Sequence, residues 1–161
     1  MNFLIISVLI ILTAMHLSYR SLQKLKQKAH RSAAIIKHLM PMVRSEHEYH
    51  SLDLNKLMTV LFLIELDTYK KTGQAIINAT WQWKNDNPTS AMVISILVEM
   101  EKRPLKINYE LTSQEISEID EVYLQVKDLS KIEVDIKMLQ ENPKLKEIVE
   151  GQLVFPHKVV S

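Results

Sequence analysis

The densest group of side chains that could do chemistry lies at residues 45–50, Ser-Glu-His-Glu-Tyr-His. On a helix His47 and His50 would share one face, and both imidazoles could ligate zinc. A zinc site needs a third ligand and a fixed scaffold, and the spacing differs from the His-Glu-x-x-His pattern of zinc hydrolases. We therefore expect a polar joint between two parts of the chain here, with metal binding as the alternative.

A second candidate is Glu65, which follows an apolar run at residues 57–64. A carboxylate on an apolar helix face is costly unless it is paired or hydrogen-bonded, and burial raises its pKa. Such a group is usually an internal carboxylate whose hydrogen bonds are satisfied. The alternatives are a proton-handling residue and a contact for a partner's Lys or Arg. No His or second acid has a spacing that identifies a general acid–base pair.

Trp81 and Trp83 stand two residues apart in the segment 74–84, for which we predict a helix. On a helix they would point about 200° from one another, so that one faces the core and the other solvent. Exposed tryptophan is over-represented at interface hot spots. Core packing is the default expectation, and Glu65, Trp81 and Trp83 are the candidate residues for contact with a partner.

The composition excludes several classes of site. The chain has no cysteine, which removes disulfides, thiolate catalysis and cysteine-ligated zinc. Its two glycines are too few for phosphate-binding loops or dinucleotide turns, which need several glycines close together. We predict no catalytic residues, no metal and no cofactor, and we do not expect an enzyme.

The first element that positions these groups is a predicted transmembrane anchor, residues 1–19. Its 18 residues from Asn2 to Tyr19 carry no formal charge at neutral pH. At about 1.5 Å per residue a helix of this length spans roughly 27 Å, close to the ~30 Å hydrocarbon core. A cleaved signal peptide would have a basic residue before the apolar core and a small-x-small site after it, and neither is present. A buried core helix is the third interpretation, which the all-round apolarity disfavours.

The basic residues set the expected orientation. Residues 20–44 contain seven bases and no acid: Arg20, Lys24, Lys26, Lys28, Arg31, Lys37 and Arg44. The positive-inside tendency then places the N-terminus outside and the following domain in the cytoplasm of a single-pass protein. The first five of these bases are candidates for contact with anionic lipid at the membrane surface, each contributing about 1 kcal/mol.

We predict that residues 20–44 form a helical stalk, since nothing breaks a helix before Pro41. Apolar and small residues recur in it at heptad spacing: Leu22, Leu25, Ala29, Ser32, Ile36 and Leu39. This seam would allow pairing with a second copy or with another membrane subunit, although Ala29 and Ser32 weaken its middle. The simpler alternative, a solvated amphipathic helix near lipid headgroups, is therefore favoured. We expect no nucleic-acid binding, because no aromatic residue interleaves with the bases and the rest of the chain is acidic.

Residues 45–151 are predicted to form an acidic helical domain of about five helices. All 19 acids lie there or beyond, against 13 bases, which gives residues 45–161 a net charge of −6. The central core helix is expected to begin at Ser51 or Asp53 and to end at Lys71. Further helices are expected over 74–84, from Asn87 to Pro104, and from the capping box at 112–115 onward. A last short helix begins at Asn142-Pro143, and residues 152–161 are expected to be a C-terminal tail.

Two segments of this domain are ambiguous. Residues 105–111 alternate apolar and polar side chains, which indicates a short strand or an extended linker. Residues 132–138 alternate too, yet Ser130 and Glu133 form a second capping box, and we favour a helix. The overall prediction is a mainly α protein with one transmembrane helix, a basic stalk and a small helical domain.

The functional hypothesis is a membrane-anchored accessory, regulatory or scaffolding subunit that works through protein–protein contacts, including contact with a second copy. One alternative is a membrane-tethered hydrolase that uses Glu65 or the His47–His50 cluster. Another is a lysis or toxin-related protein that acts by oligomerisation of its span. Under each of these hypotheses the anchor and the basic residues predict membrane lipid as a partner.

Overall fold

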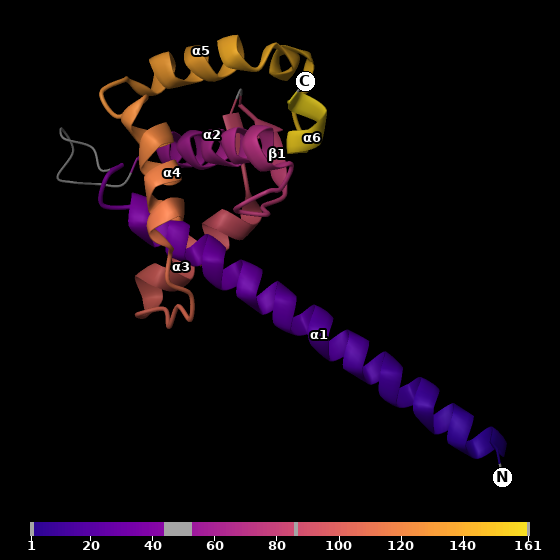
Figure 1. Ribbon diagram of the computed structural model, residues 1–161. Helices are drawn as coiled ribbons and strands as arrows, with labels where there is room; N and C mark the ends of the chain where they lie inside the picture. Colours follow the sequence, from indigo (N-terminus) through magenta and orange to yellow (C-terminus); the bar gives the residue numbers. More distant parts are fainter. Residues whose placement is uncertain (1, 44–52, 86, 161) are drawn as a thin grey trace.

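The computed structural model describes the backbone of residues 2–43, 53–85 and 87–160, and their side chains except those of residues 2–18 and Leu25. The protein is mainly helical with one small sheet (Figure 1). In chain order its elements are α1 (Asn2–Leu39), α2 (Leu54–Thr72), β1 (Trp81–Lys84), β2 (Asn87–Thr89), α3 (Ala91–Lys102), α4 (Ser113–Leu124), α5 (Lys131–Glu141), the 3-10 helix η1 (Pro143–Glu147), β3 (Leu153–Val154) and α6 (Pro156–Val159).

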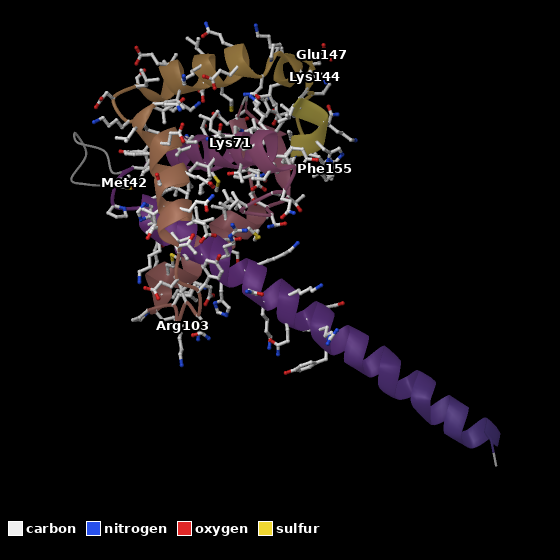
Figure 2. The ribbon with its side chains drawn as sticks, in the orientation of Figure 1. Met42, Lys71, Arg103, Lys144, Glu147 and Phe155 are labelled. Atoms are coloured by element: carbon white, nitrogen blue, oxygen red, sulfur yellow. The ribbon has the colours of Figure 1, made fainter. Side chains whose placement is uncertain are left out.

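Helix α1 is unbroken and ends shortly before Pro41, as predicted. Proline disfavours helical geometry in the residue before it and has no N–H to donate. The N-terminal half of α1 projects away from all other elements (Figure 1). Its side chains from Tyr19 to Lys24 and from Lys26 to Ala29 are exposed. Figure 2 shows side chains standing out from this part of the helix. We call the remainder of the described chain, from residue 30 onward, the head.

The predicted stalk therefore divides into an exposed part and a part that belongs to the head. The heptad positions Ser32, Ile36 and Leu39 are buried by the head, so this half of the seam packs within the chain instead of against a second helix. Leu22, in the exposed half, is 56% exposed. Among the helices whose side chains are described, none is long and apolar enough to cross a membrane. The predicted anchor, residues 1–19, is almost wholly made of residues whose side chains the structure does not describe.

Helix α2 is the centre of the head, as the sequence predicts. Asp53 caps its N-terminus by accepting a hydrogen bond from the Lys56 N–H at 2.9 Å, and Gly73 ends it in the left-handed conformation at φ +69°. Side chains from Leu57 to Leu66 are all buried. Helices α4, α5 and α6 and strand β2 pack around α2, which explains why its middle is apolar on every side (Figure 1).

The helix predicted over residues 74–84 is wrong. Residues 81–84 form β1, the middle strand of an antiparallel sheet with the order β2-β1-β3. Trp83 pairs with Pro88 of β2, and Trp81 pairs with Val154 of β3. The physical reason is the alternation Trp-Gln-Trp-Lys, whose side chains are in turn buried and exposed, which is the period of a strand.

Helix α3 begins later than predicted. Asn87 and Pro88, expected as its cap and first residue, lie in β2, and Ser90 is the N-cap residue. Proline is tolerated in β2 because that strand is at the edge of the sheet, where a missing N–H breaks no ladder. The segment 105–111 has no regular secondary structure, so the linker interpretation is correct and the strand is not.

Helices α4 and α5 begin where their capping boxes predict. Thr112 and Glu115 cap α4, and Ser130 and Glu133 cap α5, each with both reciprocal hydrogen bonds present. Residues 132–138 are thus helical, as favoured from the sequence. The second strand considered there does not form, because local capping outweighs the short apolar alternation.

Residues 152–160 include a strand and a short helix, which corrects the expectation of a C-terminal tail at 152–161. Strand β3 adds to the sheet, and α6 packs against α2 and η1. Val154 and Val159 are buried at 2% and 4% exposure. The C-terminal segment therefore completes the sheet and covers part of the core of the head.

Candidate functional site

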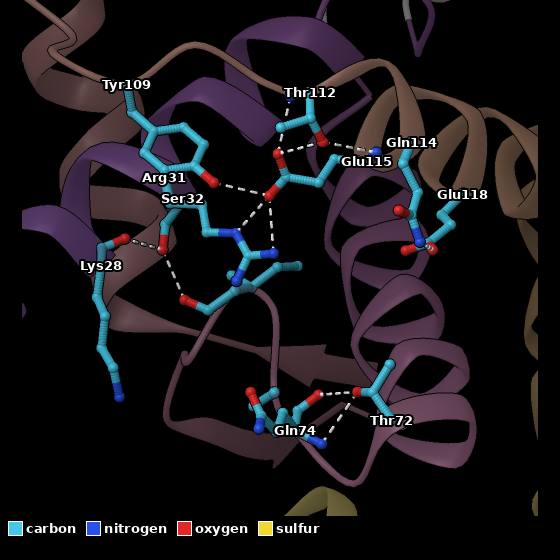
Figure 3. Close-up of polar contacts among 12 residues, drawn as sticks. Lys28, Arg31, Ser32, Thr72, Gln74, Tyr109, Thr112, Gln114, Glu115 and Glu118 are labelled. Atoms are coloured by element: carbon cyan, nitrogen blue, oxygen red, sulfur yellow. Dashed lines mark hydrogen bonds and ion pairs between the residues drawn. The ribbon is translucent and has the colours of Figure 1, made fainter.

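The most concentrated group of polar side chains in the described chain surrounds Glu115, where α1, α4 and the linker 105–111 meet (Figure 3). Its Oε1 accepts from Arg31 Nε at 2.7 Å and from the Tyr109 hydroxyl at 2.8 Å. Its Oε2 accepts from Thr112 N at 2.8 Å and from Thr112 Oγ1 at 3.0 Å. We call these four residues the Glu115 clamp, because one carboxylate joins three segments of the chain.

The clamp grows out of the local capping box of α4. In a capping box the third helical residue accepts a hydrogen bond from the cap residue's own N–H, and Glu115 does this with Thr112. The same carboxylate then has lone pairs left for a partner from elsewhere. Arg31, 84 positions earlier in the chain, supplies it with an ion pair at 2.7 Å. The sequence reveals the capping box but not the tertiary partner.

The electrostatics of the clamp keep Glu115 ionised. Burial by itself would raise the pKa of Glu115, but the hydrogen bonds from Thr112, Tyr109 and Arg31 together hold it below its ordinary value of 4.5. The pKa of Tyr109 is raised, first by burial and then by its hydrogen bond to the carboxylate. A carboxylate that accepts four hydrogen bonds and stays charged is poorly suited to proton transfer. Its chemistry is that of a structural tie.

Further polar bonds fix α1 in the head beside the clamp. Ser32 Oγ donates to the Ile77 carbonyl at 2.6 Å. Lys28 Nζ donates to Asn78 Oδ1 at 3.2 Å, and His38 Nε2 lies 2.7 Å from Asp120 Oδ1 on α4. Together with the buried face of α1, these bonds fix the segment from Lys28 to His38 against the head.

Two hollows open beside the clamp. One, of about 300 Å³, lies between α1, the end of α2 and the start of α4 and is lined by Arg31, Thr68, Thr72, Gln74, Ala75, Ile76, Tyr109, Thr112, Gln114, Glu115 and Glu118. The other, of about 230 Å³, lies toward the exposed part of α1 and is lined by Lys24, Gln27, Lys28, Arg31 and Tyr109. Tyr109 and Arg31 border both, so the clamp forms the wall between them.

Glu65 is fully buried beneath the loop that follows α2. Its Oε2 accepts a hydrogen bond from the Ile77 N–H at 2.6 Å. Burial raises the pKa of Glu65, and the N–H groups of Ile77, Ile76, Asn78 and Ala79 oppose that rise without cancelling it. This carboxyl group holds the loop 76–79 against α2 and is closed to any partner in this structure.

The raised pKa of Glu65 predicts a pH dependence of stability. Since the folded protein binds this proton more tightly than the unfolded chain, the stabilisation is complete below the ordinary pKa of 4.5 and is lost as pH rises through the folded value. Glu65→Gln keeps an acceptor for Ile77 but cannot ionise. Urea unfolding from pH 5 to 9 should show the wild type losing stability relative to Glu65→Gln with rising pH. Parallel curves for the two proteins would contradict it.

The remaining candidates from the sequence are placed as follows. Trp81 and Trp83 lie on the same face of β1 and are buried at 0% and 4% exposure, so neither indole is a surface anchor. This corrects the expectation that they point in opposite directions, which assumed a helix. His47 and His50 lie outside the described residues.

The five bases proposed for the membrane surface differ in whether they contact the head. Arg20, Lys24 and Lys26 are exposed on the projecting part of α1. Lys28 is exposed and bonded to Asn78, while Arg31 is half-buried in the clamp. Within the described part of the chain, no group of three or more histidines, aspartates and glutamates is arranged to hold a metal ion.

Comparisons with known proteins give no assignment. No protein-family model matches the chain, and no curated protein and no solved structure matches it.

Proposed function

We propose that this protein is a single-pass membrane protein whose cytoplasmic head acts as an accessory, regulatory or scaffolding subunit through protein–protein contacts. The observation that supports the proposal best is the continuity of α1. One unbroken helix contains the uncharged segment 2–19, the exposed basic segment and the part that is buried in the head. The segment 2–19 is uncharged and long enough for a bilayer, and the bases follow it on the expected cytoplasmic side.

The bonding of the deepest carboxylates supports a non-enzymatic role. Glu65 accepts a hydrogen bond from the loop 76–79, and the two carboxylate oxygens of Glu115 accept four hydrogen bonds from Arg31, Tyr109 and Thr112. Each carboxylate thus forms hydrogen bonds that hold the fold together. The enzyme alternative in which Glu65 acts on a substrate would require the loop 76–79 to open.

The exposed apolar side chains of the head favour a protein partner. Ile132 is 70% exposed and Ile136 49% exposed, one helical turn apart on α5, and Leu124 at the end of α4 is 57% exposed. Helix α5 lies on the side of α2 opposite to α1 (Figure 1). Apolar side chains gathered on one helix face are typical of contact surfaces. The projecting α1 would therefore present this face away from the bilayer.

The anchor is tested by placing a charge in the middle of the proposed span. Ile10→Arg should move the full chain from the carbonate-resistant membrane fraction to the soluble fraction, because a charge at the bilayer centre costs about 3 kcal/mol on insertion scales. The measurement is immunoblotting of both fractions at equal expression. Ile10→Val is the matched control and should stay in the membrane. Equal membrane retention of Ile10→Arg and wild type would contradict the anchor.

The subunit role is tested separately, on the full chain extracted from membranes in mild detergent. Light scattering after size-exclusion chromatography gives the protein mass of the extracted particle. A mass above that of one 18.7 kDa chain, with a constant stoichiometry, supports a subunit role. A particle containing one chain and nothing else contradicts it.

A further inference from the structure

Four basic residues of α1 form a stripe along one face of the helix. Arg20, Lys24, Lys28 and Arg31 are spaced four, four and three residues apart, which places them on one face of a helix. We call these four residues the basic stripe. One turn beyond it, the same face of α1 enters the core with Ile35 and Leu39, both fully buried. The stripe therefore lies on the same face of α1 that is buried in the head farther along the helix.

At its head end the stripe forms the floor of the 230 Å³ hollow. Lys24, Gln27, Lys28 and Arg31 line the hollow from α1, and Tyr109 closes it from the linker. Lys28 is held toward the head by its bond to Asn78. Arg31 uses Nε and Nη2 on Glu115, and its third nitrogen, Nη1, makes none of the bonds drawn in Figure 3. The hollow thus has a wall held by the Glu115 clamp, with Lys24 and Lys28 at its edge.

The charge balance of the hollow selects a ligand class. Glu115 compensates Arg31, whereas Lys24 and Lys28 form no ion pair with any carboxylate in the described residues. Two uncompensated ammonium groups match a phosphomonoester, which carries about −1.5 to −2 charges at neutral pH, better than a phosphodiester with one.

The position of the hollow along α1 selects the source of that phosphate. With a rise of about 1.5 Å per residue, Lys24 lies roughly 8 Å and Arg31 roughly 18 Å along the axis from Tyr19, the expected end of the span. The polar layer of a bilayer extends about 5–8 Å beyond the hydrocarbon core. The outer rim of the hollow therefore lies at the height of lipid headgroups. This step rests on the proposed anchor.

We propose that the hollow between the basic stripe and Tyr109 binds the phosphomonoester of an anionic membrane lipid. Lys24 and Lys28 neutralise the phosphate, and Arg31 and Tyr109 shape the wall against which it lies. The head is then seated on the membrane by a specific lipid as well as by α1. Diffuse attraction of the bases to any anionic surface is the competing explanation.

The proposal is tested by native mass spectrometry of the detergent-solubilised full chain with phosphatidic acid, and with phosphatidylglycerol of the same acyl chains. Phosphatidic acid should bind at least about tenfold more tightly, and Lys24→Gln/Lys28→Gln should lose about tenfold or more of that affinity. The matched control is Lys26→Gln/Lys37→Gln, which removes the same charge from the same helix about 200° away and should change binding less than about twofold.

Three results would overturn the proposal. Equal binding of the two lipids, or an equal loss in the control pair, would leave only diffuse attraction. Binding of inorganic phosphate or glycerol 3-phosphate as tight as that of phosphatidic acid would assign the site to a soluble phosphate. Lys24→Gln alone guards against misfolding, because Lys24 is exposed, and it should lose about threefold or more. The assay needs no inserted anchor, so its outcome is independent of the Ile10→Arg experiment.

Discussion

Replacing Trp81 with alanine should lower the free energy of unfolding by about 3–5 kcal/mol, the largest effect expected of any single substitution in the head. The Trp81 side chain is fully buried in the middle strand of the sheet. Its ring meets Phe62 of α2 edge to face, with the ring centroids 5.2 Å apart. Removing the indole leaves a cavity between the sheet and α2, at the point where the two pack together.

The measurement is denaturant unfolding of the full chain in detergent, followed by far-ultraviolet circular dichroism so that the loss of a fluorophore does not matter. Ile132→Ala is the control, because Ile132 is 70% exposed and its truncation should change stability by less than about 0.5 kcal/mol. A Trp81→Ala protein within about 1 kcal/mol of the wild type would show that the indole is not part of the core.

Replacing Glu115 with alanine should cost about 2–3 kcal/mol of unfolding free energy. The change removes the buried carboxylate of an ion pair and leaves the half-buried Arg31 guanidinium and Tyr109 hydroxyl without their acceptor. Glu121 on the same helix is the matched control. It is exposed and pairs with Lys71 at 3.3 Å, so Glu121→Ala should cost less than about 1 kcal/mol. Urea unfolding at pH 7 distinguishes the two variants.

Acid should abolish the advantage that Glu115 gives. Because the pKa of Glu115 is held below its ordinary value of 4.5, its stabilisation is present above that value and is lost as pH falls through the lower, folded value. Unfolding curves of wild type and Glu115→Gln should therefore converge as pH is lowered from 7 toward 3. A gap between them that stays constant over this range would show that the ionised carboxylate is not what stabilises the clamp.

Features that depend on neighbouring residues were predictable from the sequence. Pro41 and Gly73 end their helices, and the capping boxes at Thr112 and Ser130 begin theirs, because each acts within one helical turn. The central place of α2 followed from an apolar run too short for a membrane and apolar on every side.

The sheet was not predictable in the same way. Strand β1 takes a partner from residues 153–154, about 70 positions later in the chain, and that pairing left no local trace. The local signal lay in two asparagines, a residue type that tolerates positive φ better than most. Asn78 and Asn85 adopt φ values of 56° and 50°, which a helix cannot contain. Asn78 interrupts the expected helix 74–84, and Asn85 follows the last residue of β1.

The Glu115 clamp was only half predictable for the same reason. Thr112 and Glu115 were identified as a capping box, and Arg31 as a surface base. Their meeting depends on the packing of α1 against α4, which brings together residues 84 positions apart. The two hollows beside the clamp share this origin, so no local pattern could reveal them.

Because α1 is one continuous helix that is bonded into the head, its N-terminal segment and the head move together as a rigid unit. Any rotation of the N-terminal segment about its own axis turns the whole head through the same angle, since no hinge lies between residues 2 and 39. A tilt of that segment swings the head sideways in proportion to the exposed length of α1. The direction in which α5 faces is thus set by the register of the helix, at about 100° per residue.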